Sequence, residues 1–340
     1  MIPALRISDA LRGFVFHELK GPNLACARRG CSSSSGSGRG SGRGSGRGFG
    51  SVSFWKDALI QRQDRVTQVW RDGAHLGAVG SARILGGPKA WEIDYLYLCG
   101  SNTLLHLQEE IYPVLLDNLV QSARERGAER VFLRCSFGSE VADIAQRAGF
   151  FHYFNEVLLE GNGQVEGNAQ VEGNALPGEA RGVVEVPGGN DNTDAGIVRG
   201  RSPQDTHGLF QLFSAATPQQ VRVGLGFTLD QWRDSQESCR GLEWVAAHTD
   251  RLTGWAALWA YHGESHCEVM VHPDHPELLP VMVSRVLAQP GPQKWLVPDY
   301  QETTRDLLLR KGFRETAEYG ILAKTMATQT FSHSMAAVEA

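Results

Sequence analysis

The stretch RVFLRCSFGSEVADIAQRAGF, residues 130–150, decides the fold, because a second stretch of the same form occurs later in the chain. Its first six residues match QKWLVP at 293–298, and its closing RAGF matches RKGF at 310–313. Both matches share one offset, from 130 to 293 and from 147 to 310, which is 163 residues. Each stretch predicts a strand and then a short helix, with glycine as the left-handed C-cap of that helix. The repeated pattern indicates a duplicated structural unit.

The residues before 130 complete the first copy of this unit. Asp72-Gly73 is a hairpin signal between two apolar segments, and apolar residues spaced three and four apart precede the strand at 130. The predicted order is strand 66–71, strand 76–85, strand 91–98, helix 109–126, strand 130–135, helix 139–148 and strand 150–159.

The second copy opens with additional helices. Ser202-Pro203 supplies an N-cap and a proline at the first helical position, and Thr217-Pro218 and Thr228 mark two further helix starts. The order of the first copy then returns. The predicted strands are 196–201, 242–248, 254–261, 267–272, 294–297 and 313–326, and the later helices are 279–287 and 301–311.

Glycine is concentrated in two tracts that divide the chain. Of the 340 residues, 39 are glycine, and the excess lies in the repeats GSGR and GNGQVE, which have nothing to pack. We therefore expect a disordered Gly/Ser/Arg insertion at 32–50 and a disordered linker at 161–195. The fold class is predicted to be α+β, with domains at 1–160 and 196–327 and a disordered tail at 328–340.

Charge and composition exclude several classes of protein. A net charge of −5 argues against a nucleic-acid-binding surface that spans the whole molecule, although an arginine-glycine arm at 32–50 that contacts RNA stays a minor alternative. No apolar run reaches the roughly 18 residues of a membrane span. Six scattered cysteines do not form a disulfide scaffold. We expect a cytoplasmic protein; its oligomeric state is not predicted.

Two longer segments carry a resemblance to a known superfamily. LFQLFSAATPQQVR at 209–222 with TLDQWRDS at 228–235 resembles the acceptor-side helices of the GCN5-related N-acetyltransferases (GNAT). VMVHPDHPELLPVMVSRVLA at 269–288 resembles the strand, loop and helix with which that superfamily binds acyl-CoA. With the order of elements seen twice, the chain resembles a tandem GNAT protein with two mostly antiparallel mixed sheets flanked by helices.

The resemblance implies an acyl-CoA-dependent N-acyltransferase, in the first instance an acetyltransferase, that acts on a small-molecule or peptide amine. Glu268 stands where the superfamily often keeps a general base, and Tyr319 on the closing strand is expected to face the same cleft. For Glu268 the alternative is a carboxylate on the solvent face of an alternating strand. The expected contacts to acetyl-CoA are the backbone at Met270, Val271 and His272 and the helix start at Leu278 and Leu279.

Both halves depart from the superfamily's glycine-rich phosphate loop. In the second half, leucines replace glycines, Pro280 has no N–H, and Glu277 adds negative charge where a phosphate should lie. The positions of the usual thiolate-protonating tyrosine are Ala145 and Leu308, and Tyr300 lies too early to replace it. At least one half is therefore expected to be non-catalytic. The rival hypothesis is a degenerate GNAT pair that binds a ligand or a protein.

The remaining polar residues that we considered do not indicate a catalytic or metal site. Glu92 and Asp94 alternate with apolar residues, as on a half-buried strand. Ligand-type side chains cluster in one segment, but their spacing matches no known zinc motif, so we expect no metal. The residues of that cluster are His262, His266, Cys267, His272 and His275.

Overall fold

The computed structural model describes eight ranges of the chain: 19–20, 63–72, 75–99, 108–163, 197–236, 241–249, 251–261 and 264–326. The predicted insertion, most of the predicted linker and the predicted tail lie outside these ranges, as do 100–107. The first three linker residues do not form a linker: Gly161 to Gly163 continue a strand and pair with residues 291–293.

The first half of the chain folds in the predicted order, with element bounds within about four residues of those expected. Its elements are β1 (Leu19–Lys20), β2 (Arg65–Asp72), β3 (His75–Ile84), β4 (Ala90–Cys99), α3 (Gln108–Glu125), β5 (Arg130–Ser136), α4 (Glu140–Arg147) and β6 (Phe151–Gly163).

The second half repeats this order after three additional helices, as predicted. Its elements are β7 (Ile197–Gly200), a 3₁₀ turn η2 (Pro203–Asp205), α5 (Thr206–Ala216), α6 (Gln219–Leu225), α7 (Leu229–Ser235), β8 (Leu242–His248), β9 (Arg251–Tyr261), β10 (Glu264–Val271), α8 (Leu278–Leu287), β11 (Gly291–Pro298), α9 (Glu302–Arg310) and β12 (Arg314–Thr325).

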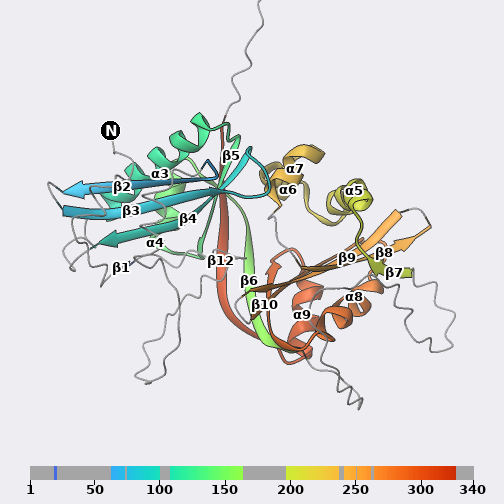
Figure 1. Ribbon diagram of the computed structural model, residues 1–340. Coiled ribbons are helices and arrows are strands. Elements are labelled where there is room, and N and C mark those ends of the chain that lie inside the picture. Colours follow the sequence, from blue (N-terminus) through green and yellow to red (C-terminus); the bar gives the residue numbers. More distant parts are fainter. Residues whose placement is uncertain are drawn as a thin grey trace, which may run out of the picture.

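The strands form one continuous mixed sheet, which confirms the predicted mixed α and β fold class (Figure 1). The strand order is β2-β3-β4-β5-β12-β6-β11-β10-β9-β8-β7, with β1 added at the end of β4. Most neighbours are antiparallel, and β4 with β5 and β10 with β11 are the parallel pairs. The two expected sheets are thus joined edge to edge.

The joint consists of two exchanged closing strands. β12, from the end of the second half, pairs with β5 of the first half, and β6, from the end of the first half, pairs with β11 of the second. β6 and β12 also pair with each other. Figure 1 shows both strands crossing from one half of the molecule to the other. Each half therefore completes its sheet with a strand from the other half.

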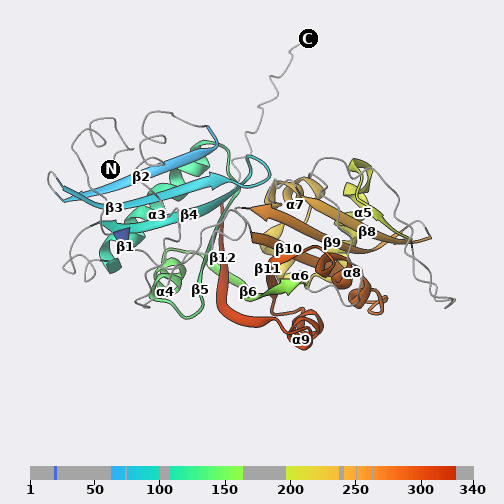
Figure 2. The ribbon, with the colours of Figure 1, turned by 60° about the horizontal axis from the view of Figure 1, so that its bottom comes forward.

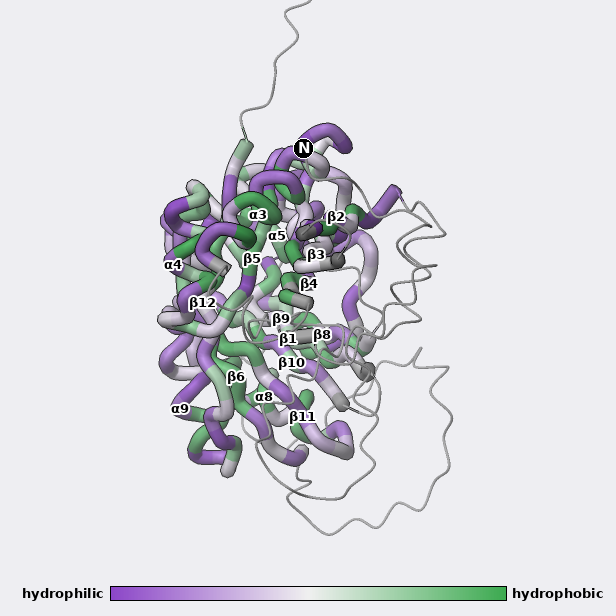
Figure 3. Tube along the Cα trace, turned by 90° about the vertical axis from the view of Figure 1, so that its left-hand side faces the viewer, coloured by the Kyte–Doolittle hydropathy of each residue, from purple (hydrophilic) through white to green (hydrophobic). Residues whose placement is uncertain are grey.

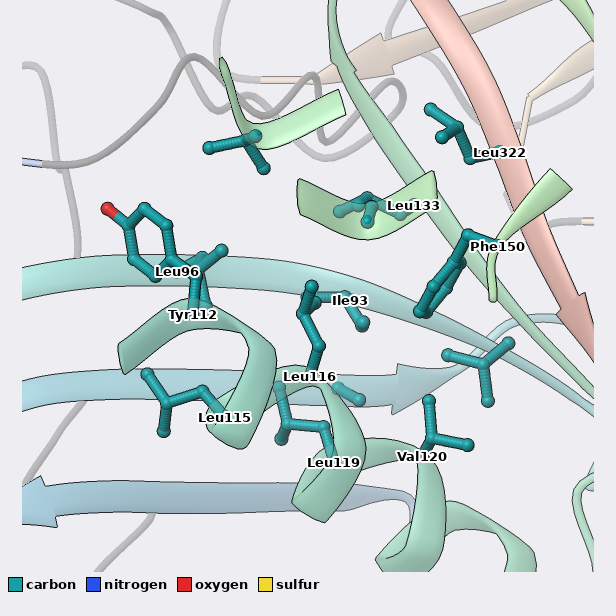
Figure 4. Close-up of a cluster of buried hydrophobic side chains, with 14 of the residues drawn as sticks. Ile93, Leu96, Tyr112, Leu115, Leu116, Leu119, Val120, Leu133, Phe150 and Leu322 are labelled. Carbon is teal, nitrogen blue, oxygen red and sulfur yellow. The ribbon is translucent and has the colours of Figure 1, made fainter. Parts of the chain in front are cut away.

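Helices cover the two faces of this sheet differently. α3 and α4 pack on the first half through a large apolar cluster that includes Leu116, Leu133 and Leu322 (Figure 4). α8 and α9 pack on the same face of the second half, around Trp295 and Phe313. In Figure 3 the chain is hydrophobic along much of α8, whereas α9 has hydrophilic and hydrophobic parts and contributes Leu308 to that core. α5, α6 and α7 pack on the opposite face.

Glycine ends both short helices as predicted. Gly149, after α4, has φ +85°, and Gly312, after α9, has φ +89°. A side chain is strained in this left-handed region, so glycine is favoured at both positions. Within the described ranges, none of the helices combines the length and the apolar character needed to cross a membrane.

The strand exchange predicts which half each core residue stabilises. Leu322 on β12 and Leu159 on β6 are both fully buried, but they belong to the first-half and second-half clusters respectively. Leu322→Ala and Leu159→Ala should each lower the free energy of unfolding by about 2–5 kcal/mol. Hydrogen exchange should become faster in α3 and β4 for Leu322→Ala, and in α8 and β9 for Leu159→Ala.

The exposed Val281 on α8 provides the control, since Val281→Ala should change stability by no more than about 0.5 kcal/mol. The opposite result, with faster hydrogen exchange in α8 for Leu322→Ala, would contradict the exchange of β6 and β12 between the halves.

Candidate functional site

A cavity of about 490 Å³ lies on the sheet face covered by α5, α6 and α7. Residues of both halves line it. The second half contributes α5, α7 and strands β8 to β11, and the first half contributes β5, β6 and the turn between β3 and β4. Figure 2 shows α7 near the junction of the two halves, where it contacts β4 of the first half. The cavity thus exists because the two halves share one sheet.

The cavity reaches a place where two strands separate. The described residues of β10 pair with β11 only from Ser265 to Cys267, and beyond that point β10 residues 268–270 and the end of β11 both line the cavity. The N–H of His272 donates to Thr253 O at 2.8 Å. Because backbone groups alternate along an antiparallel strand, the N–H and C=O groups of Val269 and Val271 point away from β9, toward this opening.

Glu268 lies in the cavity, opposite a small residue of β9. Its register partner is Ala257, and the next cavity-facing residues along β9 are Trp255 and Trp259, whose ring centroids are 6.2 Å apart. Ala257 in turn pairs with Glu243 of β8. Glu243, Ala257 and Glu268 form a line across three strands, which we call the carboxylate row. Ala257 itself is fully buried.

Glu243, at the far end of the row, is held by two donors. Arg201 donates to both of its carboxylate oxygens at 2.8 and 2.9 Å, and the indole N–H of Trp255 donates to Oε2 at 2.9 Å. The charge of Glu243 is therefore largely compensated, and the orientation of the Trp255 ring is fixed.

The first-half wall of the cavity contains a buried ion-pair network. Arg134 Nε lies 2.9 Å from Glu156 Oε2, and Arg134 Nη1 lies 3.3 Å from Glu92 Oε1. Glu92 also accepts from Arg83 at 2.7 Å. Asp94, beside it, pairs with Arg65 at 2.7 Å, and burial raises the pKa of its carboxyl. The network contains three guanidinium and three carboxyl groups.

This network corrects the interpretation of Glu92 and Asp94 as ordinary half-buried strand residues. They are only 5% and 4% exposed. A buried carboxylate requires a cationic partner, and the arginines that supply it come from β2, β3 and β5, whose register the local pattern does not reveal.

Helix α5 covers the cavity and is anchored at its start. Arg199 donates to both oxygens of Asp205 at 2.7 Å, and Ser202 N–H donates to Oδ2 at 2.7 Å. These contacts, the Arg199 hydrogen bonds foremost, lower the pKa of Asp205 to about 2. From this anchor α5 extends so that Phe213 reaches the cavity and packs on Trp232 of α7.

Helix α7 is held by the turn between β3 and β4 of the first half. The N–H groups of Gly86 and Gly87 donate to Asp234 O at 2.9 and 3.2 Å. A Cβ at Gly86 would collide with the backbone carbonyl of Gln236. Gln231 of α7 donates to Glu129 at 3.4 Å, and Glu129 also forms a salt bridge with Lys89 at 2.9 Å. The first half therefore positions α7, one of the helices that lie over the cavity.

The structure brings together only part of the predicted site. Glu268 and Met270 line the cavity. Among its lining residues in the described ranges, Tyr319 does not occur: it is buried on β12, in register with Ser136 and Glu156. Neither do Val271, His272, Leu278 or Leu279 occur among them.

The start of α8 does not suit a diphosphate. The N–H groups of Leu278 and Leu279 donate to His275 O and Pro276 O at 3.1 Å, and both side chains belong to the second-half core. Pro280 has no N–H. His272 N–H is bonded to Thr253 O, so of the three backbone groups expected to bind acetyl-CoA only that of Val271 points toward the opening.

The far end of the corresponding opening in the first half is paired with the chain's own strand β1. β4 pairs with β5 only from Ala90 to Ile93, and its last residues, Leu98 and Cys99, pair with β1. Leu19–Lys20 thus lies along the edge of β4 where β5 has separated. The two halves differ at this position, because the second-half opening leads into the cavity.

Tyr300 is a cavity residue that sequence reasoning set aside. It precedes α9, lines the cavity and stacks edge-on against Phe154 with ring centroids 5.8 Å apart. Burial raises the pKa of its phenol, so the hydroxyl stays protonated near neutral pH. Tyr300 lies far along the sequence from Leu308, the position of the superfamily's tyrosine, and was therefore not expected in the site. Its place directly after β11 is the feature of the sequence that could have indicated it.

The histidine cluster does not form a metal site in the described ranges, where no group of three or more His, Cys, Asp or Glu is placed to hold an ion. His272 and His275 have ring centroids 6.0 Å apart, and His248 lies 5.4 Å from His275. Cys267 is buried in the core under α8. His262 lies outside the described residues.

Comparison with known proteins finds no matching protein-family model and no match among curated proteins. Among solved structures, the GCN5-related N-acetyltransferase of Sphaerobacter thermophilus is 14% identical, with 81% of this chain and 85% of that chain covered and a TM-score of 0.45. A tandem GNAT protein from the clavulanic acid biosynthesis pathway is 12% identical over 82% and 89% of the two chains, with a TM-score of 0.44. Both belong to the superfamily that the order of elements resembles.

Asp205 should show the pH dependence of a carboxylate stabilised by its partners. Its pKa in the folded state lies below the ordinary aspartate value of 3.8, so its contribution to stability is present above about pH 4 and is lost as the pH falls through about 2. Carboxyl NMR should place its titration near pH 2, and Arg199→Gln should move it toward 3.8. An unshifted titration in the intact protein would contradict the anchor.

Gly86→Ala should destabilise the protein by about 1–3 kcal/mol, because the new Cβ meets backbone oxygens of the α7 end, which cannot rotate away. Urea denaturation should report the loss, and hydrogen exchange should become faster in α7. Gly200→Ala is the matched control, since a Cβ there has nothing within 4 Å. Equal stability of the two variants would show that the turn does not clamp α7.

Proposed function

We propose that the chain is an acyl-CoA-dependent N-acyltransferase, in the first instance an acetyltransferase, whose reaction takes place in the second half. One observation carries this proposal: the carboxylate of Glu268 lies in the cavity at the place where β10 and β11 separate. An extended thioester arm requires such an opening, with free backbone groups along one strand. The acceptor amine requires a base beside it.

Each step of the proposed acyl transfer is assigned to a residue of the cavity. Glu268 accepts the proton that the acceptor nitrogen loses as it bonds to the thioester carbonyl carbon. The N–H group of Val269 stabilises the negative charge that the carbonyl oxygen gains. The phenol of Tyr300 supplies the proton that the sulfur takes up when the C–S bond breaks. α5 and α7 exclude water from this side of the sheet.

The first half is proposed to be a non-catalytic partner. The last two residues of its strand β4 pair with β1, and the carboxylates equivalent to Glu268 form ion pairs with arginines in the buried network. Glu92 and Asp94 therefore stabilise the cavity wall and do not act as bases.

A second function is favoured by the start of α8. Because the N–H groups there are bonded within the loop and Pro280 has none, the diphosphate of acyl-CoA gains little from this helix end. The alternative is that the chain is a degenerate GNAT pair, which binds a small molecule without transferring an acyl group. The affinity for acyl-CoA distinguishes this binding protein from the transferase.

Glu268→Gln should lower kcat for acetyl transfer by about 10²–10⁴-fold, because the amide cannot accept the proton, while acetyl-CoA affinity stays within about twofold. Calorimetry with acetyl-CoA and steady-state kinetics measure the two quantities. Glu318→Gln, at an exposed position on β12, is the matched control and should leave both unchanged.

No binding of acetyl-CoA up to millimolar concentration by the full chain would reject the transferase in favour of the binding protein. Normal turnover by Glu268→Gln would reject Glu268 as the base and leave the transferase proposal in place.

A further inference from the structure

The chain between β11 and α9 forms a turn, Pro298 to Gln301, that carries Tyr300 into the cavity. The N–H of Gln301 donates to Pro298 O at 2.9 Å and closes the turn. Pro298 is the last residue of β11 and is in register with Glu156 of β6, and Tyr300, two residues later, lines the cavity. The turn therefore decides where the phenol lies relative to the opening between β10 and β11.

The side chain of Asp299 joins this turn to β6. Asp299 N–H donates to Asn155 O at 2.8 Å, and Asn155 N–H donates to Asp299 Oδ2 at 3.0 Å. In a regular hydrogen-bonded pair of antiparallel strands, the second of these bonds would go to the main-chain carbonyl. The carboxylate takes the place of that carbonyl, so the main chain can turn away from β6 at this residue while the Asn155 N–H stays paired.

Two further contacts fix the side chain of Tyr300. Its ring stands edge-on against Phe154, with ring centroids 5.8 Å apart and an interplanar angle of 65°. Its hydroxyl is hydrogen-bonded to the side chain of Thr217, the C-cap residue of α5. Phe154 and Asn155 are consecutive residues of β6. The strand that the first half contributes to the joint therefore holds both the main chain and the ring of this tyrosine.

From these contacts we infer that Asp299 is a positioning residue for Tyr300, and that the first half acts on the reaction through β6, which holds the turn in place. The inference rests on the proposed function, in which the phenol of Tyr300 gives its proton to the departing sulfur. A proton donor must lie within about 3 Å of its acceptor, so a small displacement of the turn is enough to lower the rate. Asp299 itself is exposed and is not among the residues that line the cavity, so it acts through the tyrosine.

The position of the ring is measured without any activity. With the 7 tyrosines of the chain labelled as 3-fluorotyrosine, the ¹⁹F signal of Tyr300 is assigned by its loss in Tyr300→Phe. Asp299→Ala removes the acceptor of the Asn155 N–H and should shift or broaden this signal. Asp299→Asn, whose amide oxygen accepts the same bond, should leave it in place. Asp306→Ala, which removes an exposed carboxylate from α9, is the matched control and should also leave it in place.

The effect on the reaction is measured as release of thiol from acetyl-CoA in the presence of n-butylamine, which reports C–S cleavage whether the amine or water attacks. Asp299→Ala should lower kcat by about 10–100-fold, with the KM for acetyl-CoA within about twofold of the wild-type value. Asp299→Asn should keep kcat within about threefold of wild type, because the bond to Asn155 is retained. In the Tyr300→Phe background, Asp299→Ala should lower kcat by no more than about a further twofold, because a residue that acts through the phenol has no effect once the phenol is gone.

Thermal unfolding confirms that each variant is folded, and the outcomes separate this inference from the proposed function. A ¹⁹F signal that Asp299→Ala leaves unchanged, or an equal loss of kcat with and without the phenol, overturns the inference and leaves the transferase intact. Normal thiol release by Tyr300→Phe also overturns it, because the phenol is then not the acid. No thiol release by the wild-type chain rejects the transferase, and the role of Asp299 in the reaction with it.

Discussion

The exchange of β6 and β12 is the constraint on which the rest of the structure depends. Each half of the duplicated chain leaves an open edge, at β5 and at β11, and each edge is closed by the last strand of the other half. The paired β6 and β12 then lie at the middle of the sheet. Two units that a linker alone would leave independent become one body, and residues of both meet on the face below α5 to α7.

The buried charges follow from this arrangement. Arg134 lies on β5 and Glu156 on β6, with β12 between their strands, so their 2.9 Å ion pair spans the exchanged strand. Removing one partner of such a pair leaves an uncompensated charge and is strongly destabilising. The same network pairs the charged side chains of the first-half wall with one another.

Local sequence predicted the elements well because their signals are local. The apolar stripe of α3, the proline after Ser202 and the glycines after α4 and α9 each act within a turn or two of chain, and the structure places all of these elements where they were expected. The exchange was not predictable, because β6 and β12 have similar apolar alternation and either could close either edge. Glu268 was predicted as a site residue from its place on the strand at 267–272. Its neighbours Ala257 and Glu243 could not be predicted, because they are set by cross-strand register, which the local sequence does not encode.

The exchanged strands also govern the order in which the protein can be made. Synthesis proceeds from the N-terminus, and domains ordinarily fold as they emerge from the ribosome. Here β5 gains its neighbour only when β12, the last described strand, has been translated. Until then the nascent first half exposes an unpaired strand edge, the kind of surface that promotes aggregation, so a pause in translation after the first half would leave it vulnerable to chaperone capture or misassembly.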